Sequence, residues 1–313
     1  MRRSRRTAPL QRQTGLIGSD ALVSRRTLLV TMGGVVGGAA LLVSCGTDGP
    51  TGSDGTALAP ETTLDGFGLV QRFPNLNLFT PGEVRLPVSI TDGQNILTTG
   101  PEVLTGWIET FDGERVAEVS APRRDEGIGI PYWEVRARLD RAVIHTLRLE
   151  GDDGYGATFE VWDAADVRTP SLGTALPALE TPTVDDHRGV EPYCTLSPEP
   201  CPFHEVTLTE ALASGKPVVY VVGTPAHCQT GTCAPGLQFA IAEQQRVGDA
   251  AVFVHADVYA DDAATTVAPA VVALHVDYEP IVYLCDAKGT LVDRLDAVWD
   301  ASELRDRIDA LLA

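Results

Sequence analysis

Two cysteines, Cys228 and Cys233, lie between a run of apolar residues (218–222) and a segment with helical periodicity. A buried strand that leads directly into a helix is typical of a layered α/β fold. A half-exposed thiol near the start of a helix feels the positive end of the helix dipole, which favours the thiolate that attacks disulfides or binds metals. The pattern therefore predicts redox or metal chemistry at a strand-to-helix turn.

Strand and helix patterns alternate from 187 to 313, which predicts an α/β domain around this turn. Thr207 and Asp300 each stand three residues before a glutamate, and this capping-box spacing predicts that a helix begins at each of them. Strands are expected at 218–222, 250–254, 280–285 and 290–295, and further helices after the thiols and at 267–274.

This order of elements resembles the thioredoxin fold, and about the last 125 residues resemble a bacterial extracytoplasmic thioredoxin-like domain. The resemblance implies that Cys228 is the exposed nucleophile and Cys233 the resolving cysteine. It also implies that Pro280 is a cis-proline that faces the thiols and binds extended substrate. The function it implies is thiol–disulfide exchange on envelope or secreted proteins without a cofactor, and we expect His227 to favour the Cys228 thiolate.

The chain departs from the family at several positions. Its thiols are spaced Cys-x4-Cys, whereas thioredoxins have Cys-x2-Cys. Val222 stands where the family has a buried aspartate, and Thr224 and His227 stand where it usually has tryptophans. A short loop gains little stability from closure, and strain makes a disulfide easier to reduce, so the departures leave both a labile redox bond and an inert structural bond open.

Two other functions also stay open. Pro-Ala-His227-Cys228 and Cys233-Ala-Pro resemble the thiol turn of copper-delivery proteins with the thioredoxin fold. Two soft thiolates and an imidazole suit copper. The copper ligands would be Cys228, Cys233 and His275, with His255 as another source of the nitrogen. In the third hypothesis, a degenerate thioredoxin-like domain is a non-catalytic interaction module on the cell surface.

The remaining cysteines divide into a local pair and a single thiol. Cys194 and Cys201 are close in sequence, and we expect them to form a structural disulfide. A zinc site made of these two thiols, Cys228, Cys233 and His204 is the alternative, and the main prediction includes no metal. Cys285 belongs to an apolar strand and is expected to be a buried free thiol.

The N-terminus carries Arg25 and Arg26 ahead of an apolar run that ends in Leu-Val-Ser-Cys45. It resembles a twin-arginine export signal joined to a lipobox. The resemblance to bacterial lipoproteins implies cleavage of residues 1–44, lipidation of Cys45 and attachment to the extracytoplasmic face of the cell membrane. An uncleaved membrane helix is the alternative.

Charge narrows the choice of partners. Loss of residues 1–44 removes seven arginines and one aspartate, so the net charge falls from −19 to about −25. The chain has only two lysines, Lys216 and Lys288. A surface this acidic repels nucleic acid, so the expected partners are exported thiol or disulfide proteins and, through acylated Cys45, the lipid membrane.

Composition divides the mature chain into four parts. Residues 45–66 are rich in Gly, Thr, Asp and Pro and are expected to form a flexible tether, and 166–186 to form a linker. Between them, 67–165 shows short alternating runs separated by turn residues, which predicts an immunoglobulin-like β-sandwich. Its strands are expected at 83–90, 106–111, 115–119, 132–139, 143–149 and 157–162.

Overall fold

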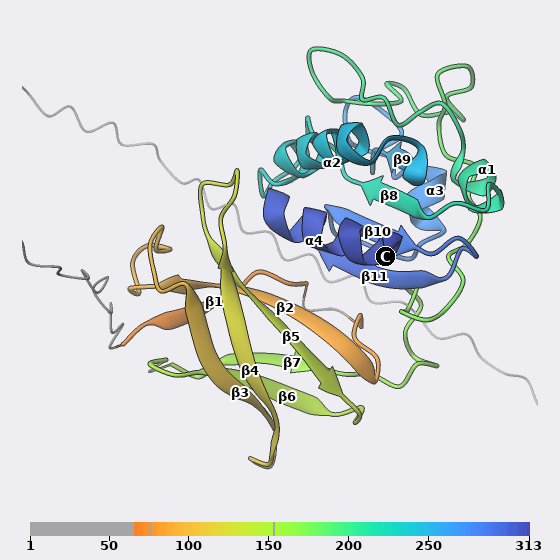
Figure 1. Cartoon of the computed structure of the whole chain (residues 1–313). Coiled ribbons are helices and arrows are strands. Elements are labelled where there is room, and N and C mark those ends of the chain that lie inside the picture. The colour runs from red at the N-terminus through yellow and green to blue at the C-terminus, as the bar shows by residue number, and fades with distance from the viewer. Residues whose placement is uncertain (1–65, 75–76, 153) are drawn as a thin grey trace, which may run out of the picture. The chain divides into compact units, whose positions relative to one another are not determined.

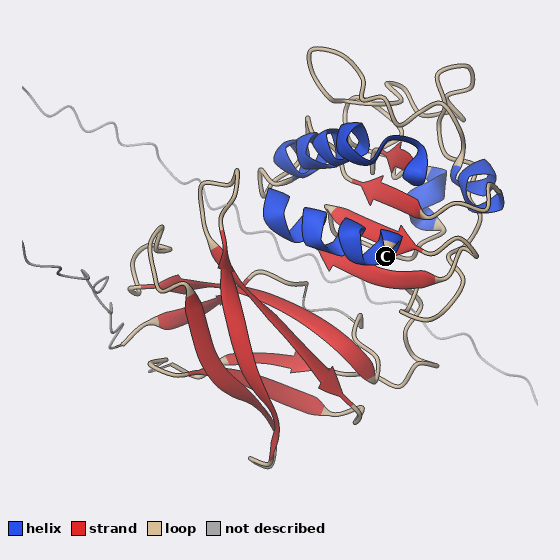
Figure 2. Cartoon of the chain, in the orientation of Figure 1, coloured by secondary structure: helices blue, strands red, loops and turns tan. Residues whose placement is uncertain are grey.

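The computed structural model describes residues 66–313, except 75–76 and 153. The predicted export signal, the lipid-attachment residue Cys45 and the tether up to residue 65 lie outside the described residues. The described residues belong to one compact unit, which has a β part followed by an α/β part (Figures 1 and 2). Within this part of the chain, no helix is both long enough and apolar enough to cross a membrane.

The β part contains seven antiparallel strands. They are β1 (Gly68–Gln71), β2 (Gly82–Thr91), β3 (Val103–Thr110), β4 (Arg115–Arg124), β5 (Tyr132–Leu139), β6 (Ile144–Leu149) and β7 (Ala157–Glu160). Their order in the sheet is β1-β2-β5-β4-β3-β6-β7. Side chains that alternate along these strands pack into one hydrophobic core, which includes Leu86, Ile108, Trp133 and Leu147.

The predicted immunoglobulin-like sandwich is not confirmed, because the strands form one barrel-like sheet and not two separate sheets. The reason lies in β4, which is long enough to pair along most of its length with β3 and then, through Arg123 and Arg124, with β5. A further bridge joins Phe79 to Val161 across the curved sheet. The six predicted strands overlap β2 to β7, whereas β1 was not predicted and β4 runs five residues beyond its predicted end.

The α/β part has a four-stranded sheet between two layers of helix. Its elements are α1 (Leu208–Ala213), β8 (Val218–Val222), α2 (Cys233–Val247), β9 (Val252–Ala256), α3 (Pro269–Val272), β10 (Ile281–Cys285), β11 (Leu291–Asp296) and α4 (Ala301–Leu312), with a 3-10 turn at Gly248–Ala250. The strand order is β11-β10-β8-β9, with only β8 and β9 parallel. This is the thioredoxin-like arrangement that the order of elements predicts.

Alternate side chains of β8 explain how both faces of this sheet are covered. Val218, Tyr220 and Val222 pack with α1 and α3, whereas Val219 and Val221 pack with α2 and α4 (Figure 1). A strand buried on both faces reads as a continuous apolar run, which is the pattern at 218–222.

The helix starts are largely as the sequence predicts. Thr207 and Glu210 form a complete capping box ahead of α1, and the Asp300 side chain accepts a hydrogen bond from the Glu303 N–H at the start of α4. Strand β9 ends two residues later than predicted, so that His255 lies within the strand and not beyond it.

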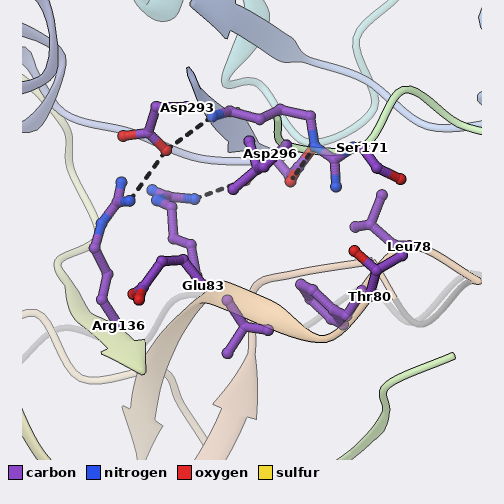
Figure 3. A pocket seen from close by; sticks show the side chains of 12 residues that line it. Leu78, Thr80, Glu83, Arg136, Ser171, Asp293 and Asp296 are labelled. Carbon is purple, nitrogen blue, oxygen red and sulfur yellow. Dashed lines mark hydrogen bonds and ion pairs between the residues drawn. The ribbon is translucent and has the colours of Figure 1, made fainter. Parts of the chain in front are cut away.

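A network of hydrogen bonds from arginines joins the β part to the α/β part. Arg136 of β5 donates to Asp293 of β11 at 3.0 Å, and Arg85 of β2 donates to the backbone oxygen of Asp296 at 3.1 Å. Figure 3 shows the contact between Arg136 and Asp293, both of which line a small cavity. The cavity measures about 30 Å³, which is room for little more than a water molecule, so it is no ligand site.

Candidate redox site and a buried thiol–histidine cluster

Cys228 and Cys233 form a disulfide with a Cα–Cα distance of 5.9 Å. Cys228 is half-buried, whereas Cys233, the first residue of α2, is only 2% exposed. The backbone N–H of Cys233 donates to Cys228 Sγ at 3.2 Å. An N–H at a helix start that points at sulfur stabilises a thiolate there when the bond is reduced. An accessible sulfur and a protected one are thus held together.

The extra residues between the cysteines form a hydroxyl-rich loop ahead of α2. Thr230 Oγ1 lies 3.3 Å from Cys228 Sγ and 2.7 Å from Thr232 Oγ1, which in turn donates to the backbone oxygen of Ala297 at 3.0 Å. The Cys-x4-Cys spacing therefore places Cys228 before the helix, and this chain of contacts holds the longer loop against the segment that follows β11.

Pro280 lies beside the buried sulfur. A Cβ atom added to Gly223 would lie 3.2 Å from Pro280 Cβ and 3.6 Å from Cys233 Sγ, so both residues border this glycine. The Glu279–Pro280 peptide bond is cis, as the family resemblance implies. The strand-end turn after β8 therefore brings Cys233 and Pro280 together although they are distant in sequence.

His227 lies on this turn, and Glu279, which precedes Pro280, contacts it. The Glu279 side chain accepts a hydrogen bond from the Thr224 N–H, and burial raises the pKa of its carboxyl group. His227 is half-buried, and its ring meets that of Tyr259 edge-on at 6.1 Å. Among the described residues, no hydrogen bond joins His227 to Cys228. His227 would therefore favour the Cys228 thiolate only through the charge on its ring.

A groove of about 290 Å³ adjoins the redox loop. The redox side contributes Thr230, Gly231, Thr232 and Pro235, and Trp299 lies next to them. The β4–β5 loop contributes residues 127–130, of which Ile130 is 40% exposed. The β part therefore supplies a largely apolar wall, which also includes Arg72, next to the redox loop.

The predicted Cys194–Cys201 disulfide is absent from the structure, where both thiols are free and buried. Their sulfur atoms turn toward the ring of His255 on β9, and His204 joins them from the segment before α1. One donor atom from each of the four residues lies within 4.8 Å of the others. The sequence places the pair correctly as neighbours but does not show that His255 of β9 contacts both sulfur atoms.

Distances within this thiol–histidine cluster are short. His255 Nδ1 lies 3.7 Å from Cys194 Sγ, 3.4 Å from Cys201 Sγ and 3.2 Å from His204 Nε2. The thiol hydrogen bond between Cys201 and Cys194 lowers the pKa of Cys194 and raises that of Cys201. Asp257 is also buried nearby, with Oδ1 3.5 Å from His255 Nε2, and burial raises the pKa of its carboxyl group to about 6.

The structure does not bring the predicted copper ligands together. His275 is exposed after α3, and the described residues contain no group that combines it with Cys228 and Cys233. Two of the five ligands in the zinc alternative, Cys228 and Cys233, are instead bonded to each other, while His255 joins the other three, Cys194, Cys201 and His204. Cys285 is a buried free thiol on β10, as predicted, and burial raises its pKa to about 12.

A solved structure resembles part of this chain, whereas the sequence itself gives no match. No model of a protein family matches the sequence, and no curated protein is significantly similar to it. A solved structure described as a thiol:disulfide interchange protein, thioredoxin family protein, from Chlorobium tepidum TLS aligns with 46% of this chain and 100% of that chain, at 12% identity and a TM-score of 0.33. That score is too low to establish a shared fold by itself, so the thioredoxin-like assignment rests on the observed strand order and helix layers.

Proposed function

We propose that this protein is a thiol–disulfide oxidoreductase whose redox centre is Cys228 and Cys233. The observation that carries the proposal is the pairing of a half-exposed sulfur with a buried one at the start of α2, where the Cys233 N–H points at Cys228 Sγ. Thiolate stabilisation at a helix start is the feature that makes one cysteine of a pair the attacking group.

The exchange has two balanced steps. With the pair oxidised, a partner thiolate attacks Cys228 Sγ, and the bond to Cys233 breaks as the mixed disulfide forms. A second thiolate of the partner then displaces Cys228, so the partner becomes oxidised and the protein gains two electrons and two protons as two thiols. The same steps in reverse reduce a partner disulfide, and the relative potentials set the direction.

The groove next to the redox loop supports a peptide partner. Its apolar lining, from residues 127–130 and Trp299, would contact the chain that flanks a partner cysteine. Pro280, which borders Gly223 together with the buried sulfur, would support the same extended chain. We assign the β part, residues 67–165, a role in substrate binding on this basis.

Export and anchoring are proposed from the sequence alone. The twin-arginine pattern and the lipobox ending at Cys45 support a lipid-anchored protein on the extracytoplasmic face of the cell membrane. Its partners there would be exported proteins with thiols or disulfides. The strong negative charge supports the exclusion of nucleic acid.

A redox titration tests the proposed activity. The protein is equilibrated in glutathione buffers of graded potential, its free thiols are tagged with maleimide, and the products are weighed by mass spectrometry. We expect one reversible two-electron step confined to Cys228 and Cys233, and trapped mixed disulfides on Cys228 in a Cys233→Ser variant. If the bond stays intact at strongly reducing potentials while the protein remains folded, the pair is structural and the proposal fails.

A further inference from the structure

We propose that Cys194, Cys201, His204 and His255 bind a zinc ion. This thiol–histidine cluster is separate from the redox pair, and the proposal goes beyond the thiol–disulfide function and does not depend on it. The four side chains come from two places in the chain: three from the segment before α1 and one from β9.

The hydrogen bonds of the two histidine rings are the first argument. His255 Nε2 lies 2.9 Å from the backbone oxygen of Gly223, and His204 Nδ1 lies 3.1 Å from that of Pro182. A carbonyl oxygen only accepts, so each of these ring nitrogens carries the proton. In neutral rings the opposite nitrogens, His255 Nδ1 and His204 Nε2, are then both acceptors, although they face each other at 3.2 Å.

Two nitrogen lone pairs that face each other at 3.2 Å repel unless a proton or a metal ion lies between them. A proton on one ring would satisfy that contact but would leave two thiols packed around the same nitrogen. A divalent metal ion satisfies all four donors at once. Histidine ligands of metals almost always donate their other N–H to a carboxylate, a carbonyl or water, and both rings here donate theirs to a carbonyl.

The distances fit a tetrahedral ion. With Zn–S bonds near 2.3 Å and Zn–N bonds of about 2.05 Å, the edges of a tetrahedron are about 3.6 Å between sulfur and nitrogen and about 3.3 Å between two nitrogens. The observed sulfur–nitrogen distances to His255 Nδ1 are 3.7 and 3.4 Å, and the nitrogen–nitrogen distance is 3.2 Å. The three distances from His255 Nδ1 therefore match the edges of a zinc tetrahedron, and all four donor atoms lie within 4.8 Å of one another.

Burial and ligand type identify the metal and its role. The four residues are 5%, 5%, 1% and 0% exposed, so the site is closed, as structural zinc sites with four protein ligands are. Two thiolates and two imidazoles in a tetrahedron suit zinc.

Residues 192–207 contain neither helix nor strand, and a zinc ion would fasten this irregular segment to β9. Binding releases the two thiol protons to solvent and involves no electron transfer.

Metal analysis of the full chain, purified in detergent without chelators, tests the site. We expect about one zinc ion per chain, and Co²⁺ in its place should show the absorption bands of tetrahedral cobalt with thiolate ligands. In Cys194→Ser and His255→Asn variants the zinc content should fall by roughly tenfold or more. Cys285→Ser changes another buried free thiol and should keep the zinc, as should the Cys228→Ser, Cys233→Ser double variant.

A second measurement on the unaltered protein covers the case in which a ligand variant fails to fold. Bound zinc should protect Cys194 and Cys201 from alkylation, and a chelator should expose both to it. A protein that takes up no zinc after reduction, or that binds Cu⁺ but not Zn²⁺, would overturn the proposal. So would a Cys194–Cys201 disulfide in the isolated protein together with no tetrahedral cobalt spectrum. Failure of the redox proposal would leave the zinc content unchanged, so the two outcomes are distinguishable.

Discussion

Arg85 on β2 and Glu303 on α4 form a buried ion pair between residues 218 positions apart, with two contacts of 2.6 Å. The Tyr132 hydroxyl donates to the same carboxylate, and Arg136 donates to it at 3.3 Å. Glu303 is fully buried. This carboxylate therefore joins side chains of two β strands to the last helix of the α/β part.

Replacement of Arg85 by leucine should destabilise the protein by about 3 kcal/mol or more, because it removes the main partner of a buried charge. Urea unfolding followed by circular dichroism measures the change. Arg138→Leu is the matched control: this arginine of β5 is 68% exposed, and its ion pairs should contribute less than about 1 kcal/mol. Equal losses for both variants would contradict the importance of the buried pair.

Acid should weaken the same contact. Burial alone would raise the pKa of Glu303, but the Arg85 guanidinium outweighs it and lowers the pKa from 4.5 to about 2. The lowered pKa stabilises the folded protein above pH 4.5, and this contribution, on the order of 3 kcal/mol, is lost as the pH falls toward 2. The difference in unfolding free energy between the natural protein and Glu303→Gln should shrink over that range. A difference that stays constant would contradict the assignment.

Cys285 should not react with thiol reagents in the folded protein. Burial raises its pKa to about 12, so hardly any thiolate exists at neutral pH, and the side chain is inaccessible on β10. Peptide mapping after maleimide treatment should find Cys285 unlabelled without denaturant and fully labelled in guanidinium. Rapid labelling under native conditions would show that β10 opens readily.

Replacement of Ile130 should slow exchange with peptide disulfides but not with small disulfides. An Ile130→Asp change adds a charge to the apolar wall of the groove and should slow exchange with a peptide disulfide several-fold. The rate with oxidised glutathione, which is too small to need the wall, should stay the same. Ile144→Asp is the matched control, because Ile144 is 39% exposed, against 40% for Ile130, but does not line the groove. An equal effect of both variants would place the substrate elsewhere.

Much of the α/β part could be predicted because its signals are local. The capping box at Thr207 and the apolar run at 218–222 each determine their element through neighbours a few residues away. The cis bond before Pro280 followed from the family resemblance and could not be derived from spacing. The β part was harder, because alternation shows which faces are buried but not that β4 pairs with strands on both sides.

The thiol–histidine cluster could be predicted only in part. The close spacing of Cys194, Cys201 and His204 is visible in the sequence, and it fits either a disulfide or a metal site. The deciding residue is His255, which is 51 positions beyond His204 and reaches it only through the packing of β9 against the segment before α1. A histidine inside an otherwise apolar strand was the available signal, since such a side chain needs polar partners.

Gly223 links the two candidate sites through a single peptide unit. Its carbonyl oxygen holds His255, while its missing side chain leaves room for Pro280 and Cys233. The same peptide unit therefore contacts both sites. A larger side chain at this position would crowd Pro280 and Cys233, directly beside the carbonyl group that contacts His255.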